Sequence, residues 1–159
     1  MNGAPLLEKI ASALAECRLE AVLIGNAAAA LHGAPVTTID FDFMFRKTEV
    51  NLVKIKRVAS CLGGTVQRPY YPASGLYRVV NESADLQVDF MSFVHGVRSL
   101  SSLKSRARRV TFGRSDLLVA DLADIIASKR AADRPRDRSV LEILEKTLNE
   151  AQKDKTHKG

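Results

Sequence analysis

The chain has 159 residues, of which 46% are hydrophobic and 26% are charged. This length suits one ordinary domain, and the composition excludes a disordered, collagen-like or disulfide-stapled protein. The net charge of +6 comes entirely from residues 98–114, because basic and acidic residues are equal in number on either side of that segment. We name residues 98–114 the basic segment; it is either a polyanion-binding surface or a solvated helix face.

The cysteines and the apolar stretches indicate the cellular compartment to expect. Cys17 and Cys61 have no metal-ligand spacing and no histidine cluster near them, so we expect buried, reduced thiols. No signal-peptide pattern opens the chain, and the most apolar stretch, residues 21–36, contains Asn, His, Gly and Pro. We therefore expect a cytoplasmic protein without a membrane partner, with one domain over residues 1–153 and a disordered tail over 154–159.

Hydrophobic periodicity and turn residues predict alternating helices and strands. In chain order they are a helix over 4–18, a strand over 21–24, a helix over 26–32, a strand over 39–45, a helix over 49–62, strands over 65–68, 76–80 and 86–91, a helix over 99–108, an extended piece over 109–112, and helices over 121–131 and 137–153. This order predicts an α/β (α+β) protein in which a mixed β-sheet is packed against helices and the C-terminus is helical.

Two aspartates alternate with aromatic residues in the predicted strand 39–45. Residues two apart on a strand share a face, so the carboxylates of Asp40 and Asp42 are expected to lie together. Two close carboxylates raise each other's pKa, and a cation such as Mg²⁺ removes that cost. Asp89 has the same setting on strand 86–91, and three carboxylates can hold two Mg²⁺ ions if the strands are adjacent. The alternative is that these acids only end strands or cap helices.

The pair Gly25-Asn26 falls where a buried strand is followed by a helix. A glycine at such a turn lets the backbone approach a ligand, and the first N–H groups of the helix face an anion. Placed before a strand with two aspartates, the turn predicts a phosphate-binding loop opposite a metal site.

These motifs resemble the DNA polymerase β-like nucleotidyltransferase superfamily. The matching pieces are Leu23-Ile24-Gly25-Asn26, Ile39-Asp40-Phe41-Asp42-Phe43 and Val88-Asp89-Phe90. Residues 121–137 look like the C-terminal helices of small bacterial members related to the abortive-infection nucleotidyltransferase toxins. The resemblance spans residues 20–144 and implies the nucleotidyltransferase fold.

The resemblance also implies residue roles. Gly25 and Asn26 would hold the triphosphate, Asp40 and Asp42 would bind Mg²⁺, and Asp89 would be the third acid, assisting the nucleophile. Two further nucleotide-binding residues are implied, Lys129 and Asp137, although by its position alone Lys129 would be a solvent-facing helix lysine. Asn26 departs from the usual Gly or Ser, and its amide can still donate to an anion. The departure leaves open a domain that has kept the fold and lost turnover.

The sequence thus predicts Mg²⁺-dependent transfer of a nucleotidyl group from an NTP to a hydroxyl of RNA, such as tRNA, or of a protein. One alternative is a catalytically silent module that pairs with a cognate toxin or antitoxin; another is a basic nucleic-acid-binding domain. Candidate acceptor-binding residues in the basic segment are Arg106, Arg108 and Arg109. Three tyrosines either stack on a base or cover the sheet edge: Tyr70, Tyr71 and Tyr77.

Overall fold

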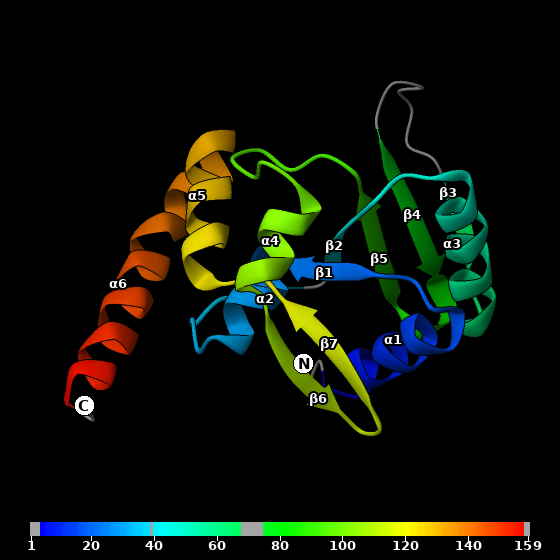
Figure 1. The fold of residues 1–159 in the computed structure, drawn as a ribbon, viewed down its shortest axis with the longest axis horizontal. Helices are drawn as coiled ribbons and strands as arrows, with labels where there is room; N and C mark the ends of the chain where they lie inside the picture. Colours follow the sequence, from blue (N-terminus) through cyan, green and yellow to red (C-terminus); the bar gives the residue numbers. More distant parts are fainter. Residues whose placement is uncertain (1–3, 39, 68–74, 158–159) are drawn as a thin grey trace.

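The computed structural model describes residues 4–38, 40–67 and 75–157 (Figure 1). Its elements are α1 (Ala4–Cys17), β1 (Ala21–Ile24), α2 (Gly25–Leu31), β2 (Phe41–Phe45), α3 (Glu49–Cys61), β3 (Thr65–Gln67), β4 (Leu76–Asn81), the 3₁₀ turn η1 (Glu82–Ala84), β5 (Leu86–Met91), α4 (Leu100–Arg106), β6 (Arg108–Phe112), β7 (Ser115–Val119), α5 (Leu122–Ala132) and α6 (Pro135–His157). None of the helices within these ranges has the length and apolar character needed to cross a membrane.

The seven strands form one sheet in the order β3-β4-β5-β2-β1-β7-β6. Strand β2 runs parallel to β5 and antiparallel to β1, while β1 runs parallel to β7. The outer pairs β3–β4, β4–β5 and β6–β7 are antiparallel. The predicted mixed sheet is therefore confirmed, and its centre is built from strands that are distant in the sequence.

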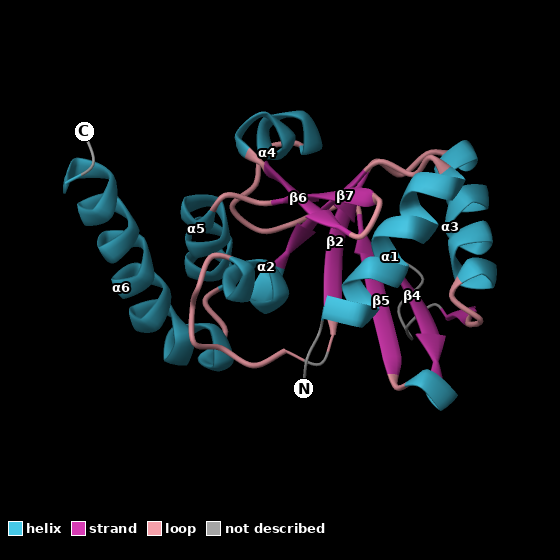
Figure 2. Cartoon of the chain, turned by 90° about the horizontal axis from the view of Figure 1, so that it is seen from below, coloured by secondary structure: helices cyan, strands magenta, loops and turns pink. Residues whose placement is uncertain are grey.

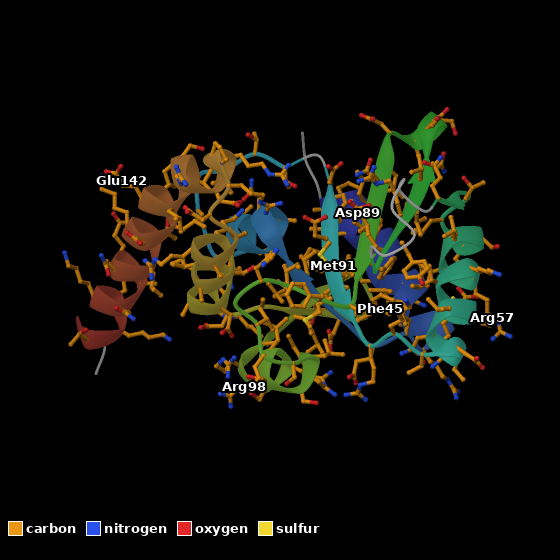
Figure 3. The ribbon with its side chains drawn as sticks, turned by 90° about the horizontal axis from the view of Figure 1, so that it is seen from above. Phe45, Arg57, Asp89, Met91, Arg98 and Glu142 are labelled. Carbon is orange, nitrogen blue, oxygen red and sulfur yellow. The ribbon has the colours of Figure 1, made fainter. Side chains whose placement is uncertain are left out.

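Part of the hydrophobic core lies between the sheet and helices α1 and α3, and the same core extends to α2, α4, α5 and α6. Helices α1 and α3 contact each other and cover one face of the sheet, as the views from below and above both show (Figures 2 and 3). Leu7, Ile10 and Leu14 recur at helical spacing on α1 and are buried. In the core, the rings of Phe43 and Phe90 stack with centroids 5.6 Å apart. Burying each such side chain stabilises the fold by about 1.5–3 kcal/mol.

The remaining helices lie away from α1 and α3. Helix α5 packs against both α2 and α6, and Figure 1 shows α5 and α6 on the opposite side of the molecule from α1 and α3. Helix α2 also contacts β1 and β2. Through α2, the central strands and the C-terminal helices are held together at one end of the sheet.

The main differences from the sequence predictions concern β7, β2 and α6. Strand β7 is not predicted, because Ser115 and Asp116 weaken its apolar pattern, and it forms by pairing with β6 and β1. Strand β2 begins at Phe41; Asp40 lies just before it, and Ile39 lies outside the described residues. Helix α6 continues to His157, past the predicted end near residue 153.

The prediction that both cysteines are buried is wrong for Cys61. Cys17 on α1 is buried and Cys61 at the end of α3 is exposed, with their Sγ atoms 3.9 Å apart. Burial raises the pKa of the Cys17 thiol to about 11, and the neighbouring Cys61 adds to the rise. The packing of α1 on α3 creates this proximity, which sequence spacing could not reveal.

Candidate functional site

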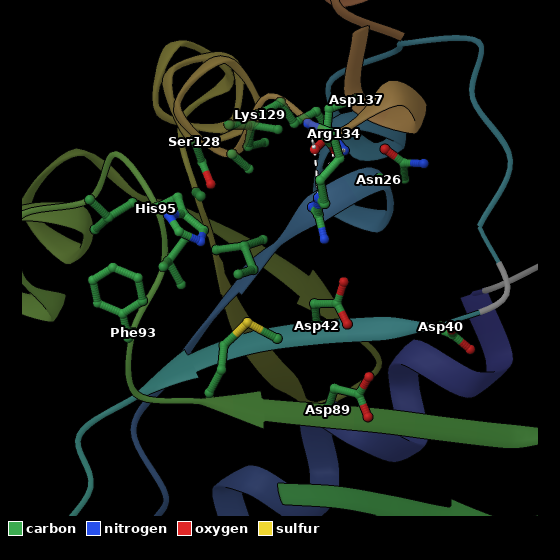
Figure 4. A pocket seen from close by; sticks show the side chains of 18 of the residues that line it. Asn26, Asp40, Asp42, Asp89, Phe93, His95, Ser128, Lys129, Arg134 and Asp137 are labelled. Carbon is green, nitrogen blue, oxygen red and sulfur yellow. Dashed lines mark hydrogen bonds and ion pairs between the residues drawn. The ribbon is translucent and has the colours of Figure 1, made fainter. Parts of the chain in front are cut away.

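A cleft of about 830 Å³ opens between the polar face of the central strands and helices α5 and α6 (Figure 4). It gathers side chains from both halves of the chain, separated in sequence by more than a hundred residues. Seven residues singled out in the sequence line it: Gly25, Asn26, Asp40, Asp42, Asp89, Lys129 and Asp137.

The parallel pairing of β2 and β5 places two of the acids side by side. Asp42 is the register partner of Asp89, and Figure 4 shows both carboxylates on the cleft side of the strands. Asp40 lines the same cleft farther along, in the residue before β2. Alternation explains this placement, because Phe41 and Phe43 turn into the core while Asp42 between them turns outward.

The closeness of these acids changes their protonation. Burial raises the pKa of Asp42 to about 6, and the charges of Asp89 and Asp40 contribute to the rise. Burial and the charge of Asp89 likewise raise the pKa of Asp40. The cationic side chains of Lys129 and Arg134 act in the opposite direction on Asp42. A cation placed among these carboxylates would therefore be bound favourably.

Asp89 is held by two neighbours on the sheet. Arg78, its register partner on β4, donates from Nε to Oδ1 at 2.9 Å and from Nη2 to Oδ2 at 3.2 Å. The amide of Gln87 donates to Oδ2 at 3.3 Å. Asp89 is only 6% exposed, so this two-point ion pair both orients its carboxylate and balances its charge.

The turn from β1 into α2 reaches the acids directly. Ile24 is the register partner of Asp42, and Gly25 follows with a φ of +71°, a conformation that favours glycine. A Cβ at Gly25 would lie 3.0 Å from Oδ2 of Asp42, so only glycine leaves this carboxylate in place. The neighbouring Asn26 has a buried Oδ1 with no hydrogen-bond partner among the described residues.

Helices α5 and α6 and the connection between them contribute three cations to the cleft, Lys129, Arg134 and Arg136, which we name the cationic wall. Asp137 is 1% exposed and accepts from Arg134, whose Nε lies 2.6 Å from Oδ2 and whose Nη2 lies 3.2 Å from Oδ1. Nζ of Lys129 lies 3.7 Å from Oδ1 of Asp137. The Lys129 side chain is 12% exposed, so its reading as a solvent-facing lysine is wrong. Burial lowers the pKa of Lys129, whereas the charge of Asp137 opposes that effect.

The basic segment divides between paired and unpaired side chains. Arg106 donates to both oxygens of Asp124, at 2.8 and 3.1 Å, and Lys104 pairs with Glu20 at 2.7 Å. Arg108 and Arg109 are exposed on the edge strand β6 and have no ion pair within the described ranges. Three strand spacings separate β6 from β2, about 14 Å. None of these three arginines lines the cleft as described.

Sequence reasoning missed several residues of the cleft. These are Arg78, Arg134 and Arg136. Together with Lys129, they bring positive charge into the cleft that holds the three acids. The signal for Arg78 was present, since pairing the predicted strands 76–80 and 86–91 as a hairpin sets Arg78 opposite Asp89. Among the tyrosines expected to stack or cover an edge, Tyr77 is buried against Phe45, and Tyr70 and Tyr71 lie outside the described residues.

The donor set fits a hard cation that keeps part of its own hydration. Within the described part of the chain, no three His, Cys, Asp or Glu side chains are gathered closely enough to hold a metal by themselves. Mg²⁺ is commonly bound through one or two carboxylates together with waters and substrate phosphates. Asp42 with its raised pKa, flanked by Asp40 and Asp89, suits such an ion.

A scan against protein-family models finds no match to the chain, and no curated protein matches it in sequence. Solved structures do match. The solution structure of the antibiotic-resistance factor ANT(2'')-Ia aligns with a TM-score of 0.64 and 14% identity, over 91% of this chain and 83% of that one. The crystal structure of ANT(2'')-Ia in complex with adenylyl-2''-tobramycin gives 0.62 and 18%, over 93% and 90%.

A third match is a structure from Thermotoga maritima. A candidate nucleotidyltransferase of Thermotoga maritima aligns with a TM-score of 0.60 and 20% identity, over 92% of each chain. Two Helicobacter pylori structures also match, at TM-scores of 0.58 and 0.51. At these identities the comparisons establish the shared architecture: this chain has the polymerase β-like nucleotidyltransferase fold.

Proposed function

We propose that the chain transfers a nucleotidyl group from an NTP to a hydroxyl group and releases pyrophosphate. The observation that carries this proposal is the register of Asp42 beside Asp89, with Asp40 in the same cleft. The same cleft holds the Gly25 turn and the cations of α5 and α6. Carboxylates beside an anion-binding wall match the needs of phosphoryl transfer, in which positioning and charge stabilisation dominate.

The proposed reaction has two parts, the exchange of bonds at phosphorus and the removal of a proton from the acceptor hydroxyl. The acceptor oxygen bonds to the α-phosphorus, the bond to the bridging oxygen of the β-phosphate breaks, and pyrophosphate leaves with the electron pair. The proton of the acceptor hydroxyl passes to a carboxylate, for which Asp89 is the candidate, and then to water. Arg78 keeps Asp89 in a fixed orientation for this role.

Asp40, Asp42 and Asp89 are the residues that would hold Mg²⁺ in this proposal. When bound, Mg²⁺ lowers the pKa of an attacking hydroxyl and neutralises charge on phosphate oxygens. Two ions would share the three carboxylates with the substrate phosphates. Both carboxylate oxygens of Asp89 accept from Arg78 and Oδ2 also accepts from Gln87, so Oδ1 is the oxygen with a lone pair left for an ion.

In this proposal the triphosphate would lie against the cationic wall. Lys129, Arg134 and Arg136 line the cleft, and the charges of the first two act on Asp42, which supports a position beside the reacting phosphate. The glycine at position 25 allows backbone N–H groups to approach the same anion. Asn26 can add its side-chain amide donor.

Labelling tests the proposal. The protein is incubated with each α-labelled NTP, Mg²⁺, total RNA and lysate, and transfer should label an acceptor. Asp40→Asn with Asp42→Asn should abolish labelling. A control with the same charge change uses two exposed acids outside the cleft, Asp85→Asn with Asp154→Asn, and should label normally. Labelling that survives in the cleft variant would overturn the proposal.

The acceptor is proposed to be RNA, such as tRNA, or a protein. ANT(2'')-Ia was crystallised with an adenylylated small molecule, which supports transfer to a hydroxyl without identifying the acceptor of this chain. The labelled product identifies it, because nuclease removes the label from RNA and protease removes it from protein.

A silent module is the second candidate, and Asn26 favours it. Its amide adds bulk beside the expected phosphates, and its buried Oδ1 presents an acceptor without a partner among the described residues. Such a module would act as the partner of a cognate toxin or antitoxin. Calorimetry with Mg²⁺ and NTPs separates the two candidates, since an enzyme must bind an NTP and a silent module should bind weakly. Asn26→Ser should strengthen NTP binding if the amide obstructs the phosphates.

A further inference from the structure

A second hollow of about 260 Å³ adjoins the cleft, and we name it the basic groove. It lies between the end of β2, the loop after β5 and the start of α4. Its lining consists of Met44, Phe45, Arg46, Lys47, Ser92, Phe93, Val97, Arg98, Ser99, Leu100 and Ser101. Phe93 and Val97 line both hollows, so a molecule lying in the basic groove can continue into the cleft.

All the charged side chains described in the basic groove are cationic. Arg46, Lys47 and Arg98 are exposed, and no acidic side chain is among the described residues that line it. Nη2 of Arg46 donates to Oγ of Ser101 at 3.3 Å, and Lys47 lies 5.9 Å from the centre of the Tyr77 ring. Within the described ranges none of the three cations has a carboxylate partner, in contrast to Arg106. Their charge is therefore available to an external anion.

Phe93 supplies an aromatic surface where the two hollows meet. Its side chain is 67% exposed, and its ring is held edge-on against His95 with centroids 5.1 Å apart. Figure 4 shows Phe93 and His95 at one side of the cleft, away from Asn26 and Asp137. Phe93 is four residues beyond Asp89, two of them past the end of β5, so the chain separates the two by at most about 14 Å. A ring within this distance would contact a neighbour of the reacting group.

We infer that the basic groove binds a single-stranded RNA acceptor, with a base stacked on Phe93 and phosphates beside Arg46, Lys47 and Arg98. This inference rests on the proposed nucleotidyl transfer for the identity of the reacting hydroxyl, which the strand presents to the acids of the cleft. The combination of a cationic groove and an exposed aromatic ring is how proteins hold single strands, because every base has a face that can stack.

The alternative occupants fit less well. An acidic peptide satisfies the cations but has no regular series of flat rings to meet Phe93. A double helix keeps its base faces stacked on one another, so it offers Phe93 no free base face to contact. The NTP itself belongs at the other side of the cleft, beside Lys129 and Arg134, whose charges act on Asp42.

The first test compares two triple variants with the same change of charge. One neutralises the groove, Arg46→Gln with Lys47→Gln and Arg98→Gln; the other neutralises Lys9, Lys56 and Arg57, which are exposed and line neither hollow. The probe is a fluorescein-labelled RNA of about 12 nucleotides, read by fluorescence anisotropy across a salt series without NTP.

The groove triple should raise Kd about 10- to 100-fold at ~0.1 M salt and reduce the salt slope by about 2, as three lost phosphate contacts predict. The control triple should change both far less. Equal losses in the two triples would overturn the inference, because they would show a response to net charge alone.

The second test addresses the ring. Phe93→Ala should weaken RNA binding about 5-fold or more, the loss of one stacked base, and Phe93→Trp should restore it. Val50→Ala removes another exposed apolar side chain, one that lines neither hollow, and should leave the affinity unchanged. Unchanged RNA affinity in Phe93→Ala, with weaker NTP binding by calorimetry, would assign the ring to the nucleotide and overturn the inference.

Different results would refute the RNA-binding groove and the proposed nucleotidyl transfer. RNA binding that follows the groove variants in a protein that labels nothing would support the groove and refute the transfer. Labelling that is confined to a protein or a small hydroxyl compound, and that is unchanged in the groove triple, would support the transfer and refute the groove.

Discussion

Gly25 lies so close to Asp42 that a Cβ atom on it would come within 3.0 Å of Oδ2 of Asp42. The contact follows from the antiparallel register of β1 and β2, which sets Ile24 opposite Asp42 and turns the chain into α2 at the next residue. The turn from β1 into α2 and the carboxylate of Asp42 are therefore one unit, and a change in the first displaces the second.

Gly25→Ala should reduce nucleotidyl transfer about 10-fold or more, because the added Cβ would push the Asp42 carboxylate by a few tenths of an ångström and misplacement of a catalytic group is costly. The substitution also carries a backbone penalty of about 1–2 kcal/mol at positive φ. Gly33→Ala is the matched control: Gly33 also has a positive φ, +91°, but nothing lies within 4 Å of its Cβ position. Both variants should lose similar stability in thermal unfolding, and only Gly25→Ala should lose activity. Equal activity in the two variants would show that a change at Gly25 does not displace the Asp42 carboxylate.

Asp42→Asn should stabilise the protein near neutral pH. The pKa of Asp42 is raised from 3.8 to about 6, chiefly by burial, so its charged form opposes folding. Because the native state holds the proton more tightly, the free energy of unfolding falls as pH rises from about 4 to about 6. The penalty, about 3 kcal/mol at most, is complete above that range. The Tm of Asp42→Asn should exceed the wild-type Tm near pH 7.5, and the gap should close near pH 4. A gap independent of pH would contradict the cause given.

The ion pair between Arg78 and Asp89 should show strong coupling in a double-mutant cycle. Asp89 is 6% exposed, so Arg78→Ala leaves a buried carboxylate without its partner, at a cost of about 3–5 kcal/mol. The Arg138–Asp133 pair provides a control with similar bond geometry and side chains that are more than half exposed. Its coupling should stay below about 1 kcal/mol. Urea unfolding of the single and double Ala variants measures both, and similar coupling in the two pairs would refute the role of burial.

Asp137→Asn should raise KM for the NTP more than it lowers kcat. Asp137 is almost fully buried and holds Arg134 by a two-point bond, with Lys129 beside it. Without its charge the two cations repel each other and the cationic wall loses its arrangement. Asp133→Asn removes an exposed acid on the same connection between α5 and α6 and should leave KM unchanged. An effect on kcat alone would mean that Asp137 does not serve substrate binding.

Much of the candidate site could be predicted because it depends on local patterns. Alternation of acids with buried aromatic residues identified Asp42 and Asp89, and a glycine after a buried strand identified the turn. The contacts between distant elements could not be predicted in this way. The pairing of Arg106 with Asp124, the burial of Lys129 and the approach of Cys61 to Cys17 all depend on how helices pack, which one sequence does not specify.

The structure shows that much of the basic segment does not form a free cationic surface. Two of its six cations are neutralised by acids from α5 and from the residue before β1, and Arg98 is its one member in the basic groove. Arg46 and Lys47 belong to a part of the sequence whose net charge is zero. Net charge along the sequence therefore did not locate the surface with unpaired cations.

The pairing of Arg78 with Asp89, together with the Lys129–Asp137–Arg134 cluster, has a consequence for how the protein is assembled. Each deeply buried carboxylate of the cleft already has a cation supplied by the chain, so folding does not wait for a metal. Only Asp42 and Asp40 remain without an ion-pair partner among the described residues. The polypeptide can therefore reach its final shape without a metal, and under the proposed function Mg²⁺ and the nucleotide would bind reversibly to a chain that is already folded.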